Sequence, residues 1–172
     1  MPAGFGSQRG CATQDAKAHR TLEFVVDIVA SYGNDAAGDP KAAPQSGATP
    51  GIVIGGALGA APSVKVGKTA KPPTSARLVV LAKGSGTPVS IGLLVLQYVA
   101  TRYNGVAAGS SYSSAPAFTL SGRSAAQNPF EQLRGVPLGS RVLLELPASA
   151  GHSAIAVVVD LIAQPKPAAQ AG

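Results

Sequence analysis

The stretch NPFEQLRGVPLGSRVLLELP, residues 128–147, decides the fold expected for this chain. Its first half carries four helix signals: Asn128 as a cap, Pro129 in the first turn, Glu131 as a capping-box partner, and Gly135 as the stop. Its second half, RVLLEL, is rich in leucine and contains a β-branched valine, which favours a strand. The stretch therefore predicts one short helix over 128–134, about two turns long, directly before a strong strand.

The rest of the chain shows strand signals and few helix signals. They are SVKV (63–66), ARLVVLAK (76–83), LLVLQYVATRY (93–103), AFTL (117–120), RVLLEL (141–146) and AIAVVVDLIA (154–163). Asn104-Gly105 is a strong hairpin signal after the third of these. Short strands at this spacing predict an antiparallel sheet, and the helix would cover one face of it. The expected fold class is therefore α+β.

Composition limits the partners of the chain. It has 172 residues, a net charge of +6, 45% hydrophobic residues, 5% aromatic residues and no tryptophan. Its basic residues are scattered singly, without aromatics beside them that could stack on bases. We therefore expect no specific nucleic-acid partner, and nucleic-acid association ranks third among the possible functions. Strong salt dependence of binding would favour that third option.

No residue pattern predicts a metal, a cofactor or a membrane span. Cys11 stands alone, and His19 and His152 lie in no ligand-spaced motif. The GKT at 67–69 lacks the first glycine of a phosphate-binding loop, because Pro62 occupies that position. The apolar segment 51–61 has too few residues to cross a bilayer. With no signal peptide at the amino end, the chain is expected to be cytoplasmic as written, or exported if the true start lies upstream.

Two segments far apart in the chain resemble each other. Residues 22–30 read LEFVVDIVA and residues 155–163 read IAVVVDLIA, with an aspartate shared before the last apolar residues. The offset between them is the length of a domain rather than of a solenoid repeat. Between the first copy and the next strand lies an Ala-, Gly- and Pro-rich stretch without periodicity, which is typical of a loose linker.

The order of these elements resembles the FKBP family of peptidyl-prolyl cis–trans isomerases, in particular the tandem forms of high-GC bacteria. The resemblance is carried by PPTSARLVVLAKGSG (72–86), the strand with Tyr98, GSSYS (109–113), VPLGSRVLLELP (136–147) and VVVDLI (157–162). It implies a strongly bent antiparallel sheet wrapped over one short helix. It also implies a layout of four parts: 1–32 as the C-terminal remnant of a preceding FKBP-like repeat, 33–61 as a flexible linker, 62–165 as a degenerate FKBP-like domain, and 166–172 as a disordered tail.

The resemblance implies isomerisation of X–Pro bonds in polypeptides. Rotation about that bond crosses a barrier of about 18–20 kcal/mol, and an apolar pocket favours the twisted state, which has less charge separation than the planar one. No nucleophile, acid or metal is needed. By position, the implied substrate pocket comprises Tyr98, Phe118, Gln127, Phe130 and Val157. Phe130 would form its floor, and Val157 stands where the family usually has phenylalanine.

The chain departs from the family at three places that matter for this pocket. Ala108-Gly109 stands where the family has Phe-Asp, and AQNP (126–129) stands where it has Val-Ile-x-Gly before the pocket aromatic. The loop between Pro147 and Ile155 is shortened to ASAGHSA. We therefore expect reduced isomerase activity. The alternative is a degenerate, non-catalytic module that binds proline-containing peptides or a protein partner. Under that alternative the aromatic residues Tyr98, Phe118 and Phe130 would be ordinary core.

The apolar strand near the amino end also predicts an interaction. An exposed strand edge invites pairing with another strand. We expect residues 1–32 either to add to the sheet of the main domain or to cause self-association through residues 20–30.

Overall fold

The computed structural model describes residues 26, 28, 30–47, 49–112, 117–120, 122 and 128–165. The chain divides into two compact units, Met1–Ser31 and Tyr32–Gly172. In the first unit Val26 and Ile28 are exposed. Most of residues 1–32 and the tail 166–172 lie outside the described residues, so the remnant repeat, the tail and the self-association stay predictions.

The second unit is a mostly antiparallel β structure with almost no helix, which is consistent with an FKBP-like fold. Its main sheet contains β1 (Ala43–Pro44), β4 (Arg77–Lys83), β5 (Gly92–Arg102), β6 (Ala107–Ser110), β7 (Ala117–Leu120), β8 (Arg141–Leu146) and β9 (Ile155–Ala163). The order is β1-β4-β8-β9-β5-β6, and β7 also pairs with β5. A separate hairpin is formed by β2 (Ile52–Gly55) and β3 (Ser63–Val66). The predicted strands are confirmed within a few residues at each end.

The predicted two-turn helix is a five-residue 3₁₀ helix, Pro129–Leu133. The predicted cap is confirmed, because the Asn128 side chain accepts a hydrogen bond of 3.2 Å from the Phe130 N–H. The backbone bonds run from residue i+3 to residue i, as from the Arg134 N–H to the Glu131 carbonyl, which is the 3₁₀ pattern. Arg134 is already extended and Gly135 has a φ of 84°, so the chain turns away before an α-helical turn can follow.

Asn128→Ala should lower the free energy of unfolding by about 1 kcal/mol, because it removes the side chain that satisfies an N–H of the first helical turn. Chemical denaturation of the full chain measures this. Arg134→Ala, an exposed change at the other end of the same helix, serves as the control and should change stability by less than about 0.5 kcal/mol. Equal effects of the two substitutions would contradict the capping role.

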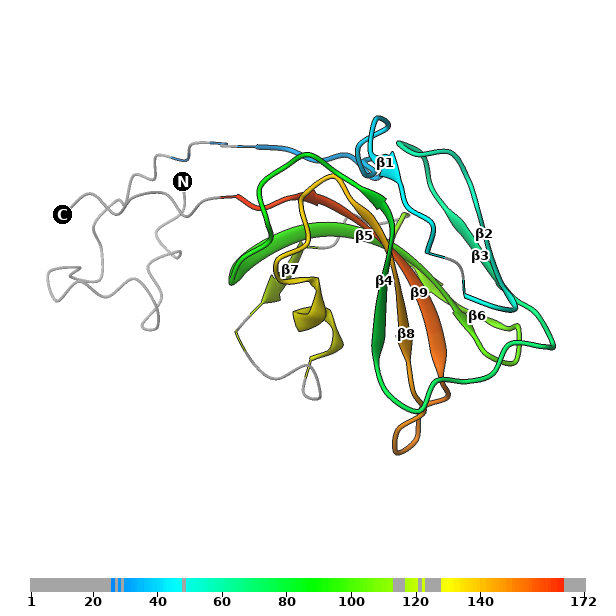
Figure 1. Ribbon diagram of the computed structural model, residues 1–172. Helices are drawn as coiled ribbons and strands as arrows, with labels where there is room; N and C mark the ends of the chain where they lie inside the picture. The colour runs from blue at the N-terminus through cyan, green and yellow to red at the C-terminus, as the bar shows by residue number, and fades with distance from the viewer. Residues whose placement is uncertain are drawn as a thin grey trace, which may run out of the picture. The chain divides into compact units, whose positions relative to one another are not determined.

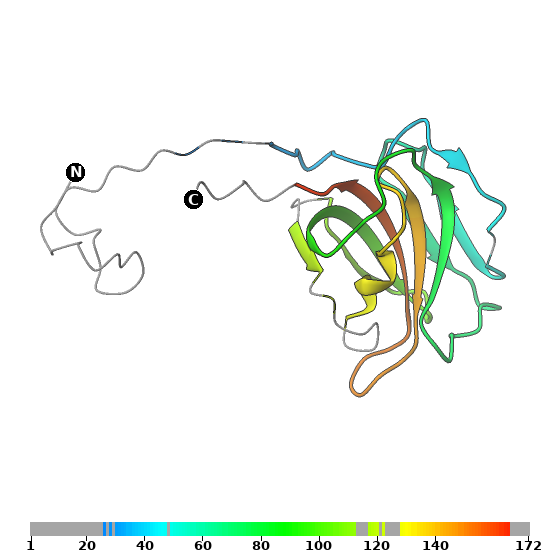
Figure 2. The same cartoon turned by 60° about the vertical axis from the view of Figure 1, so that its left-hand side comes forward.

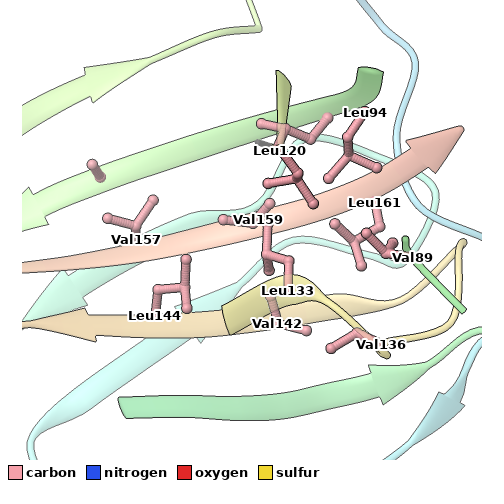
Figure 3. Close-up of a cluster of buried hydrophobic side chains, with 12 residues drawn as sticks. Val89, Leu94, Leu120, Leu133, Val136, Val142, Leu144, Val157, Val159 and Leu161 are labelled. Carbon is pink, nitrogen blue, oxygen red and sulfur yellow. The ribbon is translucent and has the colours of Figure 1, made fainter. Parts of the chain in front are cut away.

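The two faces of the main sheet bury two separate clusters. The first face packs against the 3₁₀ helix through a large cluster that includes Leu133, Val142, Leu144, Val157 and Val159 (Figure 3). The second face packs against the β2–β3 hairpin through a smaller cluster of Val64, Leu143, Ala156 and Val158. Figures 1 and 2 show the helix, in yellow, and the hairpin, in cyan and teal, on opposite sides of the curved sheet.

The stretch predicted as a flexible linker, 33–61, differs from that prediction. It contains β1, which pairs with β4, and β2, which pairs with β3. With β3 it forms a layer over the second face of the sheet, here called the cover and defined as residues 34–66. Buried side chains of the sheet hold the cover by its backbone carbonyls: Gln97 donates to Asn34, Thr101 donates to Val64, and Arg141 donates to Gly56, Ala57 and Ala60.

Candidate functional site

Three of the five predicted site residues lie on the first face of the sheet. Val157, on β9, is buried in the large cluster, between Leu144 of β8 and Ala100 of β5 in the strand register. Tyr98, on β5, and Phe130, in the 3₁₀ helix, are half-buried and pack against the same cluster. The sheet and the helix therefore bring one residue each from three distant segments to one apolar surface.

The side chains of the other two predicted residues lie outside the described part of the structure. Phe118 belongs to β7, where its backbone pairs with Leu94 of β5, and its side chain lies outside the described part of the structure. Gln127 falls wholly outside the described residues. Their roles in a pocket therefore stay predictions.

Strand β6 lies beside β5, which carries Tyr98, and all four residues of β6 are exposed. The register between β5 and β6 passes from Ala100↔Gly109 to Thr101↔Ala107, so Ala108 is the extra residue of a β-bulge. A Cβ built at Gly109 would lie 4.0 Å from the Tyr98 hydroxyl. Gly109, where the family resemblance places the Asp of Phe-Asp, therefore lies next to Tyr98, and neither Gly109 nor Ala108 carries a large side chain.

The shortened loop between β8 and β9 is a tight turn. Ser149 and His152 exchange both backbone hydrogen bonds, at 3.1 and 2.9 Å. Gly151, with a φ of 78°, supplies the left-handed residue that such a turn requires. The turn ends three residues before Ile155, which itself packs against the large cluster.

A row of buried polar side chains on the second face was not anticipated from the sequence. Asp160 accepts hydrogen bonds from Arg141 Nε at 2.7 Å and Nη2 at 2.8 Å, and from the Tyr112 hydroxyl at 2.6 Å. On the neighbouring strand Gln97 accepts from Ser111 Oγ at 2.5 Å. The sequence signal for this row was the single charged residues inside apolar strands, because a charge buried in a strand needs a partner.

The charges in this row fix its protonation. Burial, the hydrogen bond to Asp160 and its negative charge together raise the pKa of Tyr112 well above its ordinary value, so the hydroxyl stays a donor. Burial acts to lower the pKa of Arg141, but the hydrogen bonds and charge of Asp160 outweigh it, and the net shift is upward. The row is therefore a satisfied ion pair with a hydroxyl donor, which suits holding structure rather than proton transfer.

A second buried carboxylate anchors the cover at Thr49. Glu145, on β8, accepts from the Thr49 hydroxyl at 2.8 Å and from the Tyr103 hydroxyl at 2.9 Å. Arg77 lies farther away, with Nη1 at 3.8 Å from Glu145 Oε1. Burial and the Glu145 carboxylate raise the pKa of Tyr103 above its ordinary value, so this hydroxyl also remains protonated.

One hollow in the described surface, of about 690 Å³, lies between Val89–Ile91 and the helix residues Glu131 and Arg134. Another, of about 440 Å³, lies over Glu145 and is rimmed by Lys71 and Arg77. Neither of these two hollows is lined by Tyr98, Phe130 or Val157.

Within the described residues there is no group of three or more His, Cys, Asp or Glu side chains able to hold a metal ion. The same residues include no helix with the length and apolar character needed to cross a membrane.

Comparison with known proteins gives solved structures only. No family model matches the chain, and no curated protein matches it. The crystal structure of AtFKBP13 is similar over 55% of this chain and 96% of that chain, with 20% identity and a TM-score of 0.40. The crystal structure of FkpA from Escherichia coli is similar over 56% of this chain, with 23% identity and a TM-score of 0.45, and this chain covers 52% of it. Both TM-scores lie below 0.5, so neither similarity assigns a family or an activity.

Proposed function

We propose that this chain is an FKBP-type peptidyl-prolyl cis–trans isomerase domain with reduced activity, acting on X–Pro bonds of polypeptides. One observation carries the proposal. Tyr98 and Phe130, which the sequence resemblance selects as pocket residues, are half-buried against the cluster that contains Val157. Both residues keep part of their surface accessible, where a proline ring can contact them.

The chemistry needs only this surface. A proline ring packed on Tyr98 and Phe130 would hold the X–Pro bond against apolar groups and away from water. Because the twisted amide has less charge separation than the planar one, an apolar contact stabilises it preferentially. Each 1.4 kcal/mol of such preference lowers the barrier by that amount and multiplies the rate by about ten. Water that reaches the site across the exposed β6 weakens the preference, which is why the proposed activity is low.

The alternative function is a non-catalytic module that binds proline-containing peptides. The four exposed residues of β6 favour it, since the patch is open where an isomerase pocket would need a wall. Such a patch can bind a proline ring without desolvating the amide enough to speed its rotation.

Exchange NMR on an Ala-Leu-Pro-Phe peptide with the full chain tests the proposal. We expect cis–trans exchange faster than in the peptide alone, and loss of this effect in Tyr98→Leu. The matched control is Tyr103→Leu, a change of the same kind directly after the same strand, because Tyr103 packs on the opposite face of the sheet. Peptide binding without faster exchange would favour the non-catalytic module. No binding would refute both functions.

A second arm of this experiment restores the missing side chain. Ala108→Phe should increase the exchange rate about tenfold, because the ring excludes water from the open side of Tyr98. Gly109→Asp should not be combined with it, since Gly109 has a φ of 152°, which non-glycine residues adopt at a cost of about 1–3 kcal/mol. An unchanged exchange rate in a stably folded Ala108→Phe variant would contradict the role assigned to the open side.

A further inference from the structure

The residue that follows β6 holds the backbone of Tyr98. Strand β6 ends at Ser110, which pairs with Val99 of β5, so the ladder between these two strands ends beside Tyr98. Ser111 continues the pairing from there. Its N–H donates to the Tyr98 carbonyl at 2.9 Å, and its Oγ accepts from the Tyr98 N–H at 2.7 Å. One residue therefore bonds to both backbone polar groups of Tyr98.

The side-chain amide of Gln97 fixes the direction of these bonds. Gln97 Nε2 donates to the Asn34 carbonyl at 3.1 Å, and a carbonyl can only accept, so Gln97 Oε1 is the atom that faces Ser111. That oxygen also only accepts, so the Ser111 hydroxyl donates its single proton to it, at 2.5 Å. A lone pair of Ser111 Oγ is then left for the Tyr98 N–H.

This junction is shielded from water. Ser111 is 2% exposed and Gln97 is fully buried. Loss of the Ser111 hydroxyl would remove one donor and one acceptor at once, so that the Tyr98 N–H and Gln97 Oε1 would both lose these bonds. A buried polar group that loses its partner costs free energy. The chain can reduce that cost by shifting β5 at Tyr98 or by admitting water there, and either change displaces Tyr98.

The place of the Tyr98 ring in the proposed site depends on this backbone position. The ring is half-buried against the large cluster, as is that of Phe130. Phe130 belongs to a different segment, the 3₁₀ helix, so a shift of β5 at Tyr98 changes the spacing of the two rings. A proline ring that contacts both is sensitive to that spacing, since misplacement by about 1 Å can cost about a hundredfold in rate.

Resting on the proposed function, we propose that Ser111 is a positioning residue, whose hydroxyl sets the place of Tyr98 and, through Tyr98, the contact with the X–Pro bond. Ser111 does not touch the peptide itself, because its side chain is buried and its oxygen is engaged by Gln97 and Tyr98. In the motif GSSYS (109–113), the second serine is therefore the one that serves the site.

Ser111→Ala in the full chain, compared with Thr101→Ala, tests this role. Thr101 is the matched control, because its buried hydroxyl also bonds to a backbone carbonyl, but that carbonyl belongs to Val64 of the cover. Both variants are studied well below their unfolding transitions. In exchange NMR on the Ala-Leu-Pro-Phe peptide, Ser111→Ala should reduce the acceleration about tenfold or more, and Thr101→Ala should change it by less than about twofold.

The NMR signals of Tyr98 in the free chain give a second readout, which does not depend on activity. In Ser111→Ala the ring signals of Tyr98 should shift and its amide proton should exchange faster with solvent, whereas Thr101→Ala should leave both unchanged. If Ser111→Ala does not fold, the unaltered chain decides. A Tyr98 amide proton protected from exchange supports the inference, and one that exchanges as fast as an unprotected amide overturns it.

The two readouts separate this inference from the proposed function. No acceleration by the unaltered chain refutes the proposed function, while the Tyr98 signals still show whether Ser111 sets the place of Tyr98. Unchanged signals and unchanged acceleration in a folded Ser111→Ala variant overturn the inference alone. Equal losses of acceleration in Ser111→Ala and Thr101→Ala would reflect lower stability rather than positioning, and would also overturn it.

Discussion

Arg141→Met is expected to lower the free energy of unfolding of the full chain by about 3–5 kcal/mol. The Arg141 guanidinium is buried and donates to both carboxylate oxygens of Asp160 and to the carbonyls of Gly56, Ala57 and Ala60. Methionine fills a similar volume but donates nothing, which leaves a buried carboxylate with only the Tyr112 hydroxyl among these donors. Chemical denaturation measures the loss.

The chain provides a matched control for this prediction. Arg77 also extends from a strand toward an acid on the neighbouring strand, but 56% of its side chain is exposed and its contact with Glu145 is 3.8 Å. Arg77→Met should therefore cost less than about 1 kcal/mol. Arg141→Met should in addition speed proteolysis between residues 56 and 60, because the cover loses its attachment there. Similar costs for the two arginines would contradict the anchoring role.

The second large effect concerns the helix that decides the fold. Leu133→Ala should lower the free energy of unfolding by about 2–5 kcal/mol, because Leu133 is fully buried between the helix and the sheet (Figure 3). Phe130→Ala, three residues earlier, should cost less than Leu133→Ala despite the larger side chain, since Phe130 is only half-buried. Phe130→Ala should nevertheless abolish the acceleration of X–Pro exchange.

Two measurements on the same pair of variants distinguish a surface residue from a core residue. Denaturation gives the stability loss, and exchange NMR on the X–Pro peptide gives the effect on function. If Phe130→Ala is the more destabilising variant and peptide binding is unchanged, then Phe130 is core packing and the proposed site loses its floor. Leu133→Ala, measured below its unfolding transition, should keep the peptide effect.

The strands and the helix cap were predictable because their signals are local. RVLLEL and IAVVVDLIA are rich in apolar residues and lie in the centre of the sheet, where both faces are buried. Asn128 before Pro129 fixes a helix start by sequence alone. The type of helix was not predictable, because it depends on how soon the chain must turn at Gly135 to pair Val136 with Val89.

The cover and the polar row could not be predicted for a different reason. A periodic pattern marks a segment that packs by its side chains. The β2–β3 hairpin packs in that way, but residues 56–60 and Asn34 are held through carbonyl oxygens, which every residue possesses. Which acid faces Arg141 depends on the register of β8 against β9, and Asp160 is its direct partner only in the observed register. Of the candidate site, the sequence indicated the residues on the first face, but it did not show how far each of them is buried.

Attachment through backbone carbonyls has a consequence for how this chain can vary. Between residues 34 and 60, side-chain substitutions should cost little stability at most positions, because Gln97 and Arg141 donate to backbone carbonyls and not to side chains. Insertions and deletions should be purged there, because a shift by one residue moves every carbonyl away from its donor. The exceptions include Gly51, Gly56 and Gly59, where positive φ angles and close neighbours leave no room for a side chain. They also include Thr49, which bonds to Glu145, and Ile52 and Ile54, which pack against the sheet. The length of this segment is thus expected to stay fixed, while most of its side chains can change.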